Sequence, residues 1–259
     1  RSYTKGQRSW NSSLRISTIT GKAMKKNFFL IIVFLAGAFC FPLFAFGQKA
    51  GYEQFFGEVI SYDVRSLAMK MADAHTELKG RVDLDGRKTY LIVFEATGSN
   101  FFDKERIYAD PEDLYPLRVE RDVTYLGSVE QIIEIYDQEK FTVTITKTTK
   151  AKPEPESLVI QKKGKIDNIY CFIYRYRLTG DFKIGSSLSL NLPTKDVSVK
   201  VVKNTTLDAE GNHFNTVFLE TIPSQYRMWF DVRKRKVPIR IDKPAMVGGT
   251  IMVMKGYKK

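Results

Sequence analysis

The stretch ADAHTELKGRVDLDGRKTYLIVFEATG, residues 72–98, decides the fold because it contains two strand patterns and the turn that joins them. Apolar and polar side chains alternate on both sides of the turn, which is the period of a strand with one face in water. Between the two patterns lies Asp85-Gly86, a pair that readily adopts the positive φ angles of a tight hairpin. The stretch therefore predicts an antiparallel β-hairpin.

The same alternation recurs along most of the chain, with turn residues at short intervals. Besides 72–84 and 89–98, the predicted strands are 57–67, 116–126, 129–137, 141–148, 187–192, 197–207, 214–222, 226–232, 237–242 and 249–257. A charged, proline-interrupted loop, KAKPEPES, follows the first half of this set, and no repeat of 20–50 residues is present. We therefore expect residues 51–259 to form a single all-β domain with one short helix. Its architecture should be a curved antiparallel sheet or half-open barrel of about a dozen strands.

Residues 165–180, KIDNIYCFIYRYRLTG, are the exception to the strand pattern. Apolar side chains recur at i, i+3, i+4, i+7 and i+8, which is one helical stripe, although the same residues also alternate as in a strand. Asp167 as N-cap and Gly180 as terminator favour a helix over 167–178. Its aromatic stripe is explained either by packing against the sheet or by lining a ligand site.

Residues 24–50, MKKNFFLIIVFLAGAFCFPLFAFGQKA, have the build of a secretory signal. A basic start is followed by the uncharged residues 28–47, a length that also suits an uncleaved inner-membrane anchor, since ~17–25 apolar residues can span a bilayer. The polar, basic residues 1–23 are interpreted as upstream sequence before a true start at Met24. In either case we expect the rest of the chain to be exported to the periplasm.

Cys40 lies within this segment and resembles the cysteine of a lipid attachment site. The bulky Phe39 precedes it, where a lipidation signal has a small residue, so we interpret Cys40 as an ordinary apolar residue of the signal. Cleavage is instead expected after Gly47 or Ala50, which follow small-x-small patterns.

The chain has 41 Lys and Arg against 29 Asp and Glu, a net charge of +12. Residues 1–47 hold seven of the basic residues and no acidic one, which leaves the exported part with 34 against 29, or +5. This small excess gives no reason to expect nucleic acid as a partner. Outside the cytoplasm, the expected anionic partners are lipid head groups or glycans.

Motifs for catalysis or metal binding are missing from the sequence. His75 lies in a predicted strand and His213 beside a hairpin turn, and neither has the spacing of a metal site. Cys171 is the single cysteine of the exported part, so no disulfide can form within that part, and its apolar surroundings suit a buried thiol. We therefore expect no enzyme, no catalytic residue, no bound metal and no cofactor.

The densest charge cluster of the chain is Arg233, Lys234, Arg235 and Lys236. A solvated hairpin tip explains it, because charge near a strand end also discourages edge-to-edge pairing. Alternatively, together with the nearby Trp229, the cluster contacts the head groups of an anionic membrane or glycolipid, each surface charge adding ~1 kcal/mol.

Several landmarks occur in a fixed order along the chain. They are Gly57-Glu58-Val59, VDLDGRKTYLIVFEATGSNFF, PLRVE, YDQEK, FKIGSSLSL, AEGNHFNTVFLE and WFDVRKRKVPIRI. With them, residues 55–257 resemble the bacterial domain-of-unknown-function family numbered 3108, a group of exported β-rich proteins. The resemblance implies no catalytic residues. More loosely, it implies similarity to the periplasmic lipoprotein-carrier type of fold, which suits an apolar ligand, although fold alone is a weak basis for function.

These observations lead to the hypothesis of a non-catalytic exported binding protein that holds an apolar or lipid-like ligand between a curved sheet and the 167–178 helix. The candidate lining residues are Phe94, Phe101, Phe102, Tyr170, Ile173, Tyr174, Phe218 and Trp229. The alternative is a structural or assembly factor of the cell envelope that binds another protein through a sheet edge.

Phe101-Phe102 separates two accounts of the lining. Irregular backbone after Asn100 would let both rings turn into the core, and this is the account we favour. On a regular strand, adjacent side chains point to opposite faces, so only one ring could enter the core and the other would face water, a helix or a ligand. In that alternative, one ring lies at the rim of an open apolar mouth.

Overall fold

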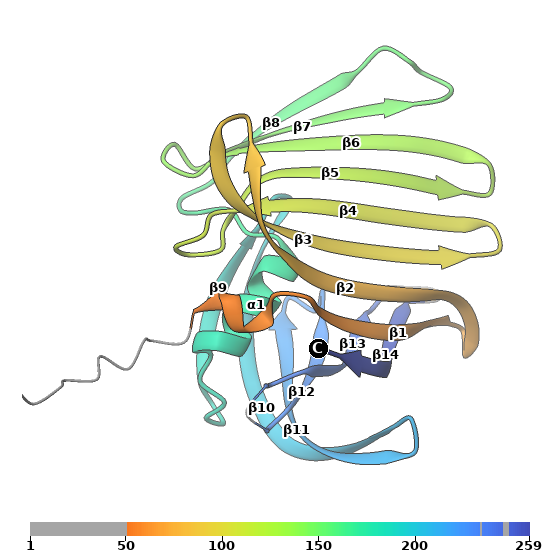
Figure 1. Ribbon diagram of the computed structural model, residues 1–259, viewed down its shortest axis with the longest axis vertical. Helices are drawn as coiled ribbons and strands as arrows, with labels where there is room; N and C mark the ends of the chain where they lie inside the picture. Colours follow the sequence, from red (N-terminus) through yellow and green to blue (C-terminus); the bar gives the residue numbers. More distant parts are fainter. Residues whose placement is uncertain (1–50, 234, 246–248) are drawn as a thin grey trace, which may run out of the picture. The chain divides into compact units, whose positions relative to one another are not determined.

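The computed structural model describes residues 51–233, 235–245 and 249–259. Residues 1–23 and 24–50, which the sequence assigns to an upstream extension and a signal or anchor segment, lie outside this described part. The described residues form a 14-stranded antiparallel sheet, one α-helix, α1 (Ile169–Thr179), and a short 3-10 helix, η1 (Tyr52–Phe55) (Figure 1). The all-β fold class with one short helix is therefore confirmed.

Strand order in the sheet is β8-β7-β6-β5-β4-β3-β2-β1-β14-β13-β12-β11-β10-β9. The strands are β1 Glu58–Ser66, β2 Met69–Leu84, β3 Arg87–Gly98, β4 Phe101–Ala109, β5 Pro116–Tyr125, β6 Ser128–Asp137, β7 Thr142–Thr149, β8 Glu156–Gln161, β9 Ser187–Leu192, β10 Lys195–Ala209, β11 Asn212–Ile222, β12 Arg227–Asp231, β13 Pro238–Lys243 and β14 Thr250–Lys258. Each half is a meander of consecutive hairpins, and β1 joins the halves by pairing with β14. Within the described residues the sheet remains open, because β8 and β9 each pair with another strand along one edge only.

The predicted hairpin is formed by β2 and β3. Asp85 and Gly86 take φ angles of 53° and 84°, and the Gly86 amide donates a 2.8 Å hydrogen bond to the Asp83 carboxylate. Positive φ at both central residues matches the twist of the flanking strands. The Asp-Gly signal thus sets the register of this pair, with Leu84 opposite Arg87.

The long strand β2 bends at a bulge between Leu78 and Gly80, where its register with β3 shifts. Gly80 has φ of 125°, and a Cβ there would meet the Phe56 ring at 3.6 Å. A bulge bends its strand and increases the local twist. The curvature predicted from sequence therefore has a local cause at this glycine.

Two strands, β4 and β8, are missing from the sequence-based prediction. The charged run in β4 resembles a loop, but its alternate residues form cross-strand ion pairs on both faces of the sheet. On one face, Lys104 contacts Glu95 at 2.8 Å and Arg106 contacts Glu120 at 3.2 Å. These partners lie on the neighbouring strands β3 and β5. The periodicity of β4 by itself does not show which residues of those strands it will meet.

Phe101 and Phe102 begin β4 on regular backbone. Gly98 pairs with Phe101 and Thr97 with Phe102, so the two rings point to opposite faces. The favoured account, in which irregular backbone turned both rings inward, is wrong. A two-residue loop at Ser99-Asn100 suffices to reverse the chain and leaves the strand undistorted.

The helix forms where the sequence predicts it, but its cap is shifted by one residue. Asn168 is the N-cap, and its side-chain oxygen accepts a 2.8 Å hydrogen bond from the Tyr170 amide. Asp167, the predicted cap, lies just before the helix and instead forms an ion pair with Arg175, a residue of the helix. Gly180 does terminate the helix, with its amide donating to the Tyr176 carbonyl at 2.8 Å.

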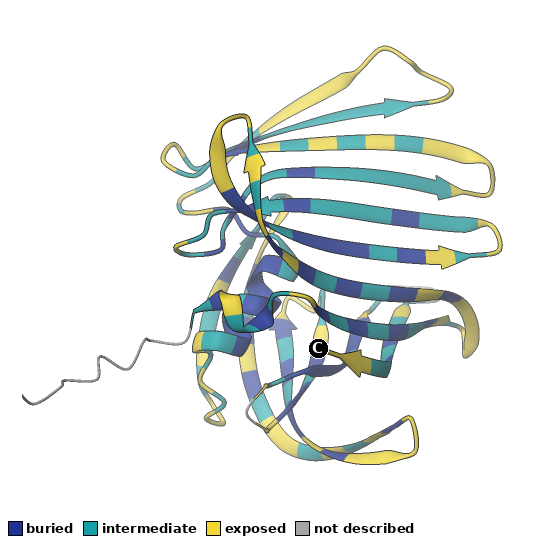
Figure 2. Ribbon diagram, viewed as in Figure 1, coloured by how far each residue is buried: buried dark blue, intermediate teal, exposed yellow. Residues whose placement is uncertain are grey.

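The helix contributes residues to two apolar clusters, and much of it is buried (Figure 2). Phe172 and Ile173 pack into the cluster built mainly from β1, β2 and the second half of the sheet, and Tyr174 packs into the cluster built from η1 and β2–β7. One amphipathic helix thereby contributes to both clusters. The space that it leaves uncovered beside the sheet is the candidate site.

Candidate functional site

A cavity of about 490 Å³ lies between the N-terminal half of α1, the helix-facing side of β3–β7 and residues near the ends of β9, β13 and β14. Its lining is Val64, Phe94, Ala96, Phe101, Asp103, Glu105, Val119, Arg121, Ile132, Glu134, Tyr136, Ile145, Asp167, Asn168, Ile169, Tyr170, Ile173, Leu192, Pro193, Thr194, Tyr226, Ile241, Lys243, Thr250 and Met252. The lining residues on β4, β5 and β6 are alternate ones, as the two-residue period of a strand requires.

One part of the cavity is apolar and rich in aromatic rings. Phe94 of β3 stacks on Tyr170 of the helix, with ring centroids 4.7 Å apart and planes 19° apart. Phe101 packs against the apolar cluster that contains Phe94. Ile173 belongs to the same cluster and lies one turn after Tyr170 in the helix. These side chains can enclose the apolar part of a small molecule.

Beside it is a charged wall formed by Asp103 and Glu105 of β4, Arg121 of β5 and Glu134 of β6. The Arg121 guanidinium donates two hydrogen bonds to Asp103, at 2.7 and 2.6 Å, and lies 3.4 Å from a Glu105 oxygen. The side-chain amide of Asn168 donates a hydrogen bond to the other Glu105 oxygen at 3.4 Å. Two carboxylates, those of Asp103 and Glu105, therefore share one guanidinium.

Burial alters the protonation of two of these carboxylates. Loss of solvent raises the pKa of Glu105 from 4.5 to about 7, although the nearby Arg121 charge acts in the opposite direction. Burial also raises the pKa of Glu134, which accepts a hydrogen bond from the Tyr136 hydroxyl. Glu105 therefore titrates near neutral pH, and pKa values perturbed in this way are common in binding and catalytic sites.

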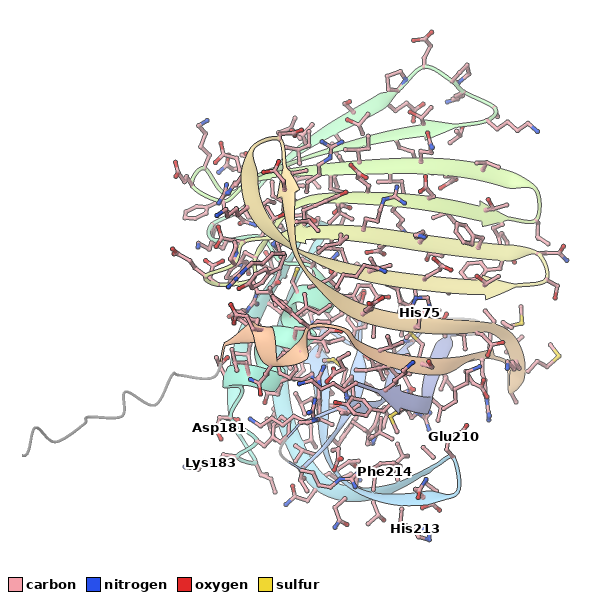
Figure 3. The ribbon with its side chains drawn as sticks, in the orientation of Figure 1. His75, Asp181, Lys183, Glu210, His213 and Phe214 are labelled. Carbon is pink, nitrogen blue, oxygen red and sulfur yellow. The ribbon has the colours of Figure 1, made fainter. Side chains whose placement is uncertain are left out.

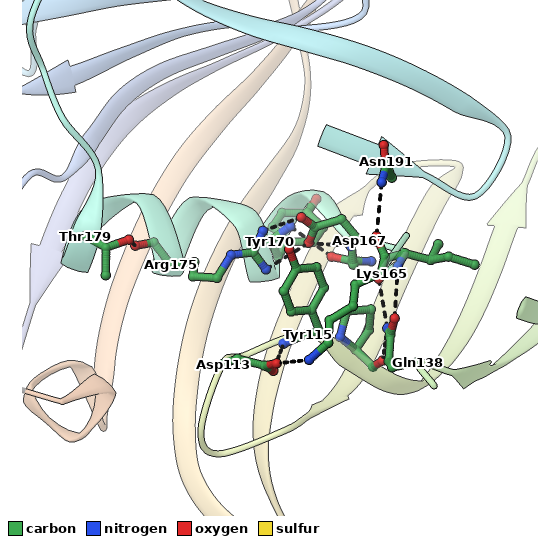
Figure 4. Close-up of polar contacts among 12 residues, drawn as sticks. Asp113, Tyr115, Gln138, Lys165, Asp167, Tyr170, Arg175, Thr179 and Asn191 are labelled. Atoms are coloured by element: carbon green, nitrogen blue, oxygen red, sulfur yellow. Dashed lines mark hydrogen bonds and ion pairs between the residues drawn. The ribbon is translucent and has the colours of Figure 1, made fainter. Parts of the chain in front are cut away.

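A polar network fixes the N-terminus of α1 beside this wall (Figure 4). Gln138 bonds both polar groups of the Ile166 backbone, accepting from its amide at 2.9 Å and donating to its carbonyl at 2.8 Å. The Asp167 amide donates to the Asn191 carbonyl at 2.7 Å, and Arg175, paired with Asp167, lies 4.1 Å above the Tyr115 ring. Burial raises the pKa of Asp167, while Arg175 opposes that shift. The helix is therefore tied to both halves of the sheet.

Four of the eight residues predicted to line a site face this cavity: Phe94, Phe101, Tyr170 and Ile173. Phe102 lies on the other face of β4, opposite Thr124. That any of these residues binds a ligand stays a prediction.

The other three predicted residues point elsewhere. Tyr174 is buried in the second cluster, 5.8 Å from the Phe55 ring. Phe218 and Trp229 contact each other across β11 and β12, with centroids 4.7 Å apart, and Arg240 lies over Trp229 at 4.9 Å. Their aromatic character alone did not reveal which face of the sheet each would occupy.

The charged wall is the part of the site that sequence reasoning missed. Its residues lie in segments that have the composition of solvent-exposed strands and loops. The available signal was the spacing of Asp103 and Glu105, two residues apart, which places both carboxylates on one face of a strand. Only the pairing with β5 places Arg121 opposite Glu105.

The basic cluster is largely engaged within the protein. Arg233 forms an ion pair with Asp231 at 2.6 Å, and Arg235 donates a 2.7 Å hydrogen bond to the Tyr257 hydroxyl. Lys236 donates to the Gly180 carbonyl at 2.9 Å, and burial lowers its pKa. Lys234 lies outside the described residues. Contact of this cluster with head groups stays a prediction.

A second cavity, of about 620 Å³, lies between the β12–β13 turn, which carries the basic cluster, and the β10–β11 turn. It is lined by Glu210, Asn212, His213, Phe214, Asp231, Arg233, Arg235, Val237, Ile239, Met254, Lys255, Gly256 and Tyr257. Figure 3 shows Glu210, His213 and Phe214 at or next to the β10–β11 turn, and His75 on β2, well away from that turn. His213 is paired with Asp208 and is largely exposed.

Within the part of the chain that the structure describes, no three His, Cys, Asp or Glu side chains are grouped so that they could hold a metal ion. Cys171 is buried, and burial raises the pKa of its thiol. Over the same described residues, no helix combines the length and the apolar character needed to cross a membrane.

Three solved structures are similar in part. A β-barrel-like protein of the domain of unknown function DUF1849 from Brucella abortus is 8% identical with a TM-score of 0.44, covering 78% of this chain and 96% of that one. A protein described as exported, with a YmcC-like fold, from Bacteroides fragilis is 10% identical with a TM-score of 0.31, covering 79% and 96%. A protein described as a lipoprotein from Parabacteroides distasonis is 8% identical with a TM-score of 0.29, covering 79% and 96%.

No curated protein matches the sequence. A family model does match, over residues 61–255, which span most of the sheet from β1 to β14 together with the helix and the cavity. That model is described as "Protein of unknown function (DUF3108)". The chain therefore belongs to the DUF3108 family.

Proposed function

We propose that this protein is a non-catalytic exported binding protein whose cavity holds an apolar or lipid-like ligand. The observation that carries the proposal is the 490 Å³ cavity beside α1, lined by aromatic and aliphatic side chains together with the charged wall and further polar groups. Binding sites for small molecules typically have volumes of ~300–1,000 Å³ and this kind of lining. The export part of the proposal is supported by the signal-like residues 24–50.

The position of the helix supports the same function. Tyr170 and Ile173 contribute side chains to the cavity from successive turns of α1, and hydrogen bonds at the helix N-terminus hold that end in place. A preformed apolar cavity needs little ordering when a ligand enters, which favours affinity.

The adjacent residues Phe101 and Phe102 provide a matched test, because only Phe101 faces the cavity. Protein purified from the periplasm under gentle conditions should carry a bound lipid in native mass spectrometry. We expect Phe101→Ser to reduce the fraction with bound lipid by about fivefold or more, since a ring lost from the lining removes ~2–3 kcal/mol of apolar contact. Phe102→Ser should leave that fraction unchanged.

Two results would contradict the proposal. One is a wild-type protein that has a bare mass and takes up no added long-chain amphiphile. The other is an equal loss of lipid in the Phe101 and Phe102 variants when both remain folded by circular dichroism.

A second candidate function, assembly of the cell envelope through a sheet edge, is favoured by one observation. β8 pairs only with β7, and its side chains Leu158 and Val159 are 56% and 64% exposed. An edge strand with exposed apolar side chains can accept a strand from another protein. A bare mass together with a stoichiometric protein partner in cross-linked periplasmic extract would favour this candidate.

A further inference from the structure

The cavity described above has an excess of acidic groups. Its acidic lining residues other than Asp167, which pairs with Arg175, are Asp103, Glu105 and Glu134, and its basic ones are Arg121 and Lys243. Lys243 is an exposed residue at the end of β13, and among the described lining residues the ion pairs of Asp103 and Glu105 are formed with Arg121. The cavity defines the binding site, and the charges of its lining determine whether an anionic or a cationic ligand can bind there.

Arg121 has little capacity to bind an incoming anion. Its guanidinium already donates twice to Asp103, which has 8% of its side chain exposed, and contacts Glu105 as well. A carboxylate or phosphate that approached this guanidinium would meet Glu105 and Glu134 at close range. Like charges in a partly buried site repel strongly, because solvent screens them little.

A cation would meet the opposite situation. Glu105 has one guanidinium, shared with Asp103, and one amide contact from Asn168, and Glu134 has the Tyr136 hydroxyl as its hydrogen-bond donor. An ammonium group has donors for both carboxylates, and hydrogen bonds between charged partners are stronger than neutral ones. The faces of nearby aromatic rings, such as Tyr170, also attract cations.

We propose that the ligand is a cationic amphiphile, whose ammonium-type head group lies against Glu105 and Glu134 while its hydrocarbon part lies among Phe94, Phe101 and Ile173. This inference rests on the proposed function and names the class of ligand for the same cavity. It differs from the simplest lipid-carrier picture, in which an uncharged acyl chain alone is recognised.

The test uses three probes with the same twelve-carbon chain: dodecylamine, dodecanol and laurate, each below its micellar concentration at pH 7.5. Isothermal titration or native mass spectrometry of the mature protein gives the three dissociation constants. We expect dodecylamine to bind about tenfold or more tightly than dodecanol, in line with a charge-assisted hydrogen bond, and laurate to bind most weakly.

Variants then locate the head group. Glu105→Gln and Glu134→Gln should each weaken dodecylamine about tenfold while leaving dodecanol unchanged, because only the ammonium contacts the carboxylates. Glu120→Gln is the control, since Glu120 lies on β5 between two cavity-lining positions and pairs with Arg106 on the other face.

The outcomes separate this inference from the proposed function. If laurate binds as tightly as dodecylamine, or if the two glutamine variants bind dodecylamine as the wild type does, the cationic ligand is ruled out and the apolar cavity remains. If none of the three probes binds, the proposed function itself is wrong.

Discussion

Burial of the Glu105 carboxylate costs stability when the group is charged, and the same charged group is the one proposed to bind a cation. Its side chain is 13% exposed on β4, and it shares Arg121 with Asp103. Burial disfavours the charged carboxylate, so the folded protein holds a proton on Glu105 up to about neutral pH. A group with this behaviour links the stability of the protein, and the proposed binding of a cation, to pH.

The first prediction concerns that linkage. The pKa of Glu105 is raised from 4.5 to about 7 in the folded state, so between these values the folded protein binds more protons than the unfolded chain. Its contribution to stability is complete below pH 4.5 and is lost as pH rises through 7. Between pH 5 and 8 the wild type should lose up to about 3 kcal/mol of unfolding free energy more than Glu105→Gln does.

Urea unfolding of the ligand-free proteins at several pH values measures this difference directly. Other carboxylates that titrate, such as Glu134, are common to both proteins and cancel in the comparison. Parallel stability profiles for the wild type and Glu105→Gln would show that Glu105 has an ordinary pKa.

At the scale of elements, the helix is held at its C-terminal end by a buried ion pair. Arg177 of α1 and Glu58 of β1 both have fully buried side chains, and one of their two hydrogen bonds is 2.9 Å long. The Arg235 carbonyl accepts a further bond from Arg177 at 3.1 Å, and Tyr257 donates to Glu58 at 2.8 Å. The partners of this ion pair therefore come from the helix, from β1 and β14, and from the turn between β12 and β13.

We predict that Arg177→Met destabilises the protein by about 3–5 kcal/mol, because it leaves the Glu58 carboxylate buried without its partner. The double variant with Glu58→Gln should be less destabilised than the sum of the two single changes. Lys152→Met is the control, since Lys152 and Glu156 form an exposed pair whose loss should cost only about 0–1 kcal/mol. Additive single effects in chemical unfolding would show that the pair is not coupled.

At the scale of the whole described sheet, burial is uneven. β3 lies between two paired neighbours and contains buried Tyr90, Ile92 and Val93, whereas the side chains of β8 are mostly exposed and one edge is free (Figure 2). Strands β3–β7 line much of the cavity. In the order of the sheet they extend from the well-buried β3 towards the open edge at β8. Local opening should begin at that edge.

Hydrogen exchange measures this gradient. We predict that amides of β8 exchange about a hundredfold or more faster than those of β3, because opening the edge exposes few buried apolar contacts. Addition of a ligand that binds in the cavity should protect β4–β6 more than β8. Protection of β8 equal to that of β3 in the free protein would contradict this gradient and would indicate that the edge is covered.

Much of the fold follows from local sequence. All twelve strands predicted from alternation are present, with bounds shifted by at most three residues, and the Asp85-Gly86 turn and the helix lie where they were expected. These features depend on the backbone geometry of a few consecutive residues, which the order of apolar, polar and turn residues specifies.

The tertiary structure alone decided the rest. The pairing of β1 with β14, the ion pair of Arg177 with Glu58 and the meeting of Glu105 with Arg121 and Asn168 join residues distant in the chain. A strand pattern shows which side chains share a face, but not what that face will meet. For this reason the sequence determined an antiparallel sheet with one helix, whereas the packing of the helix against that sheet determined the cavity and its acidic wall.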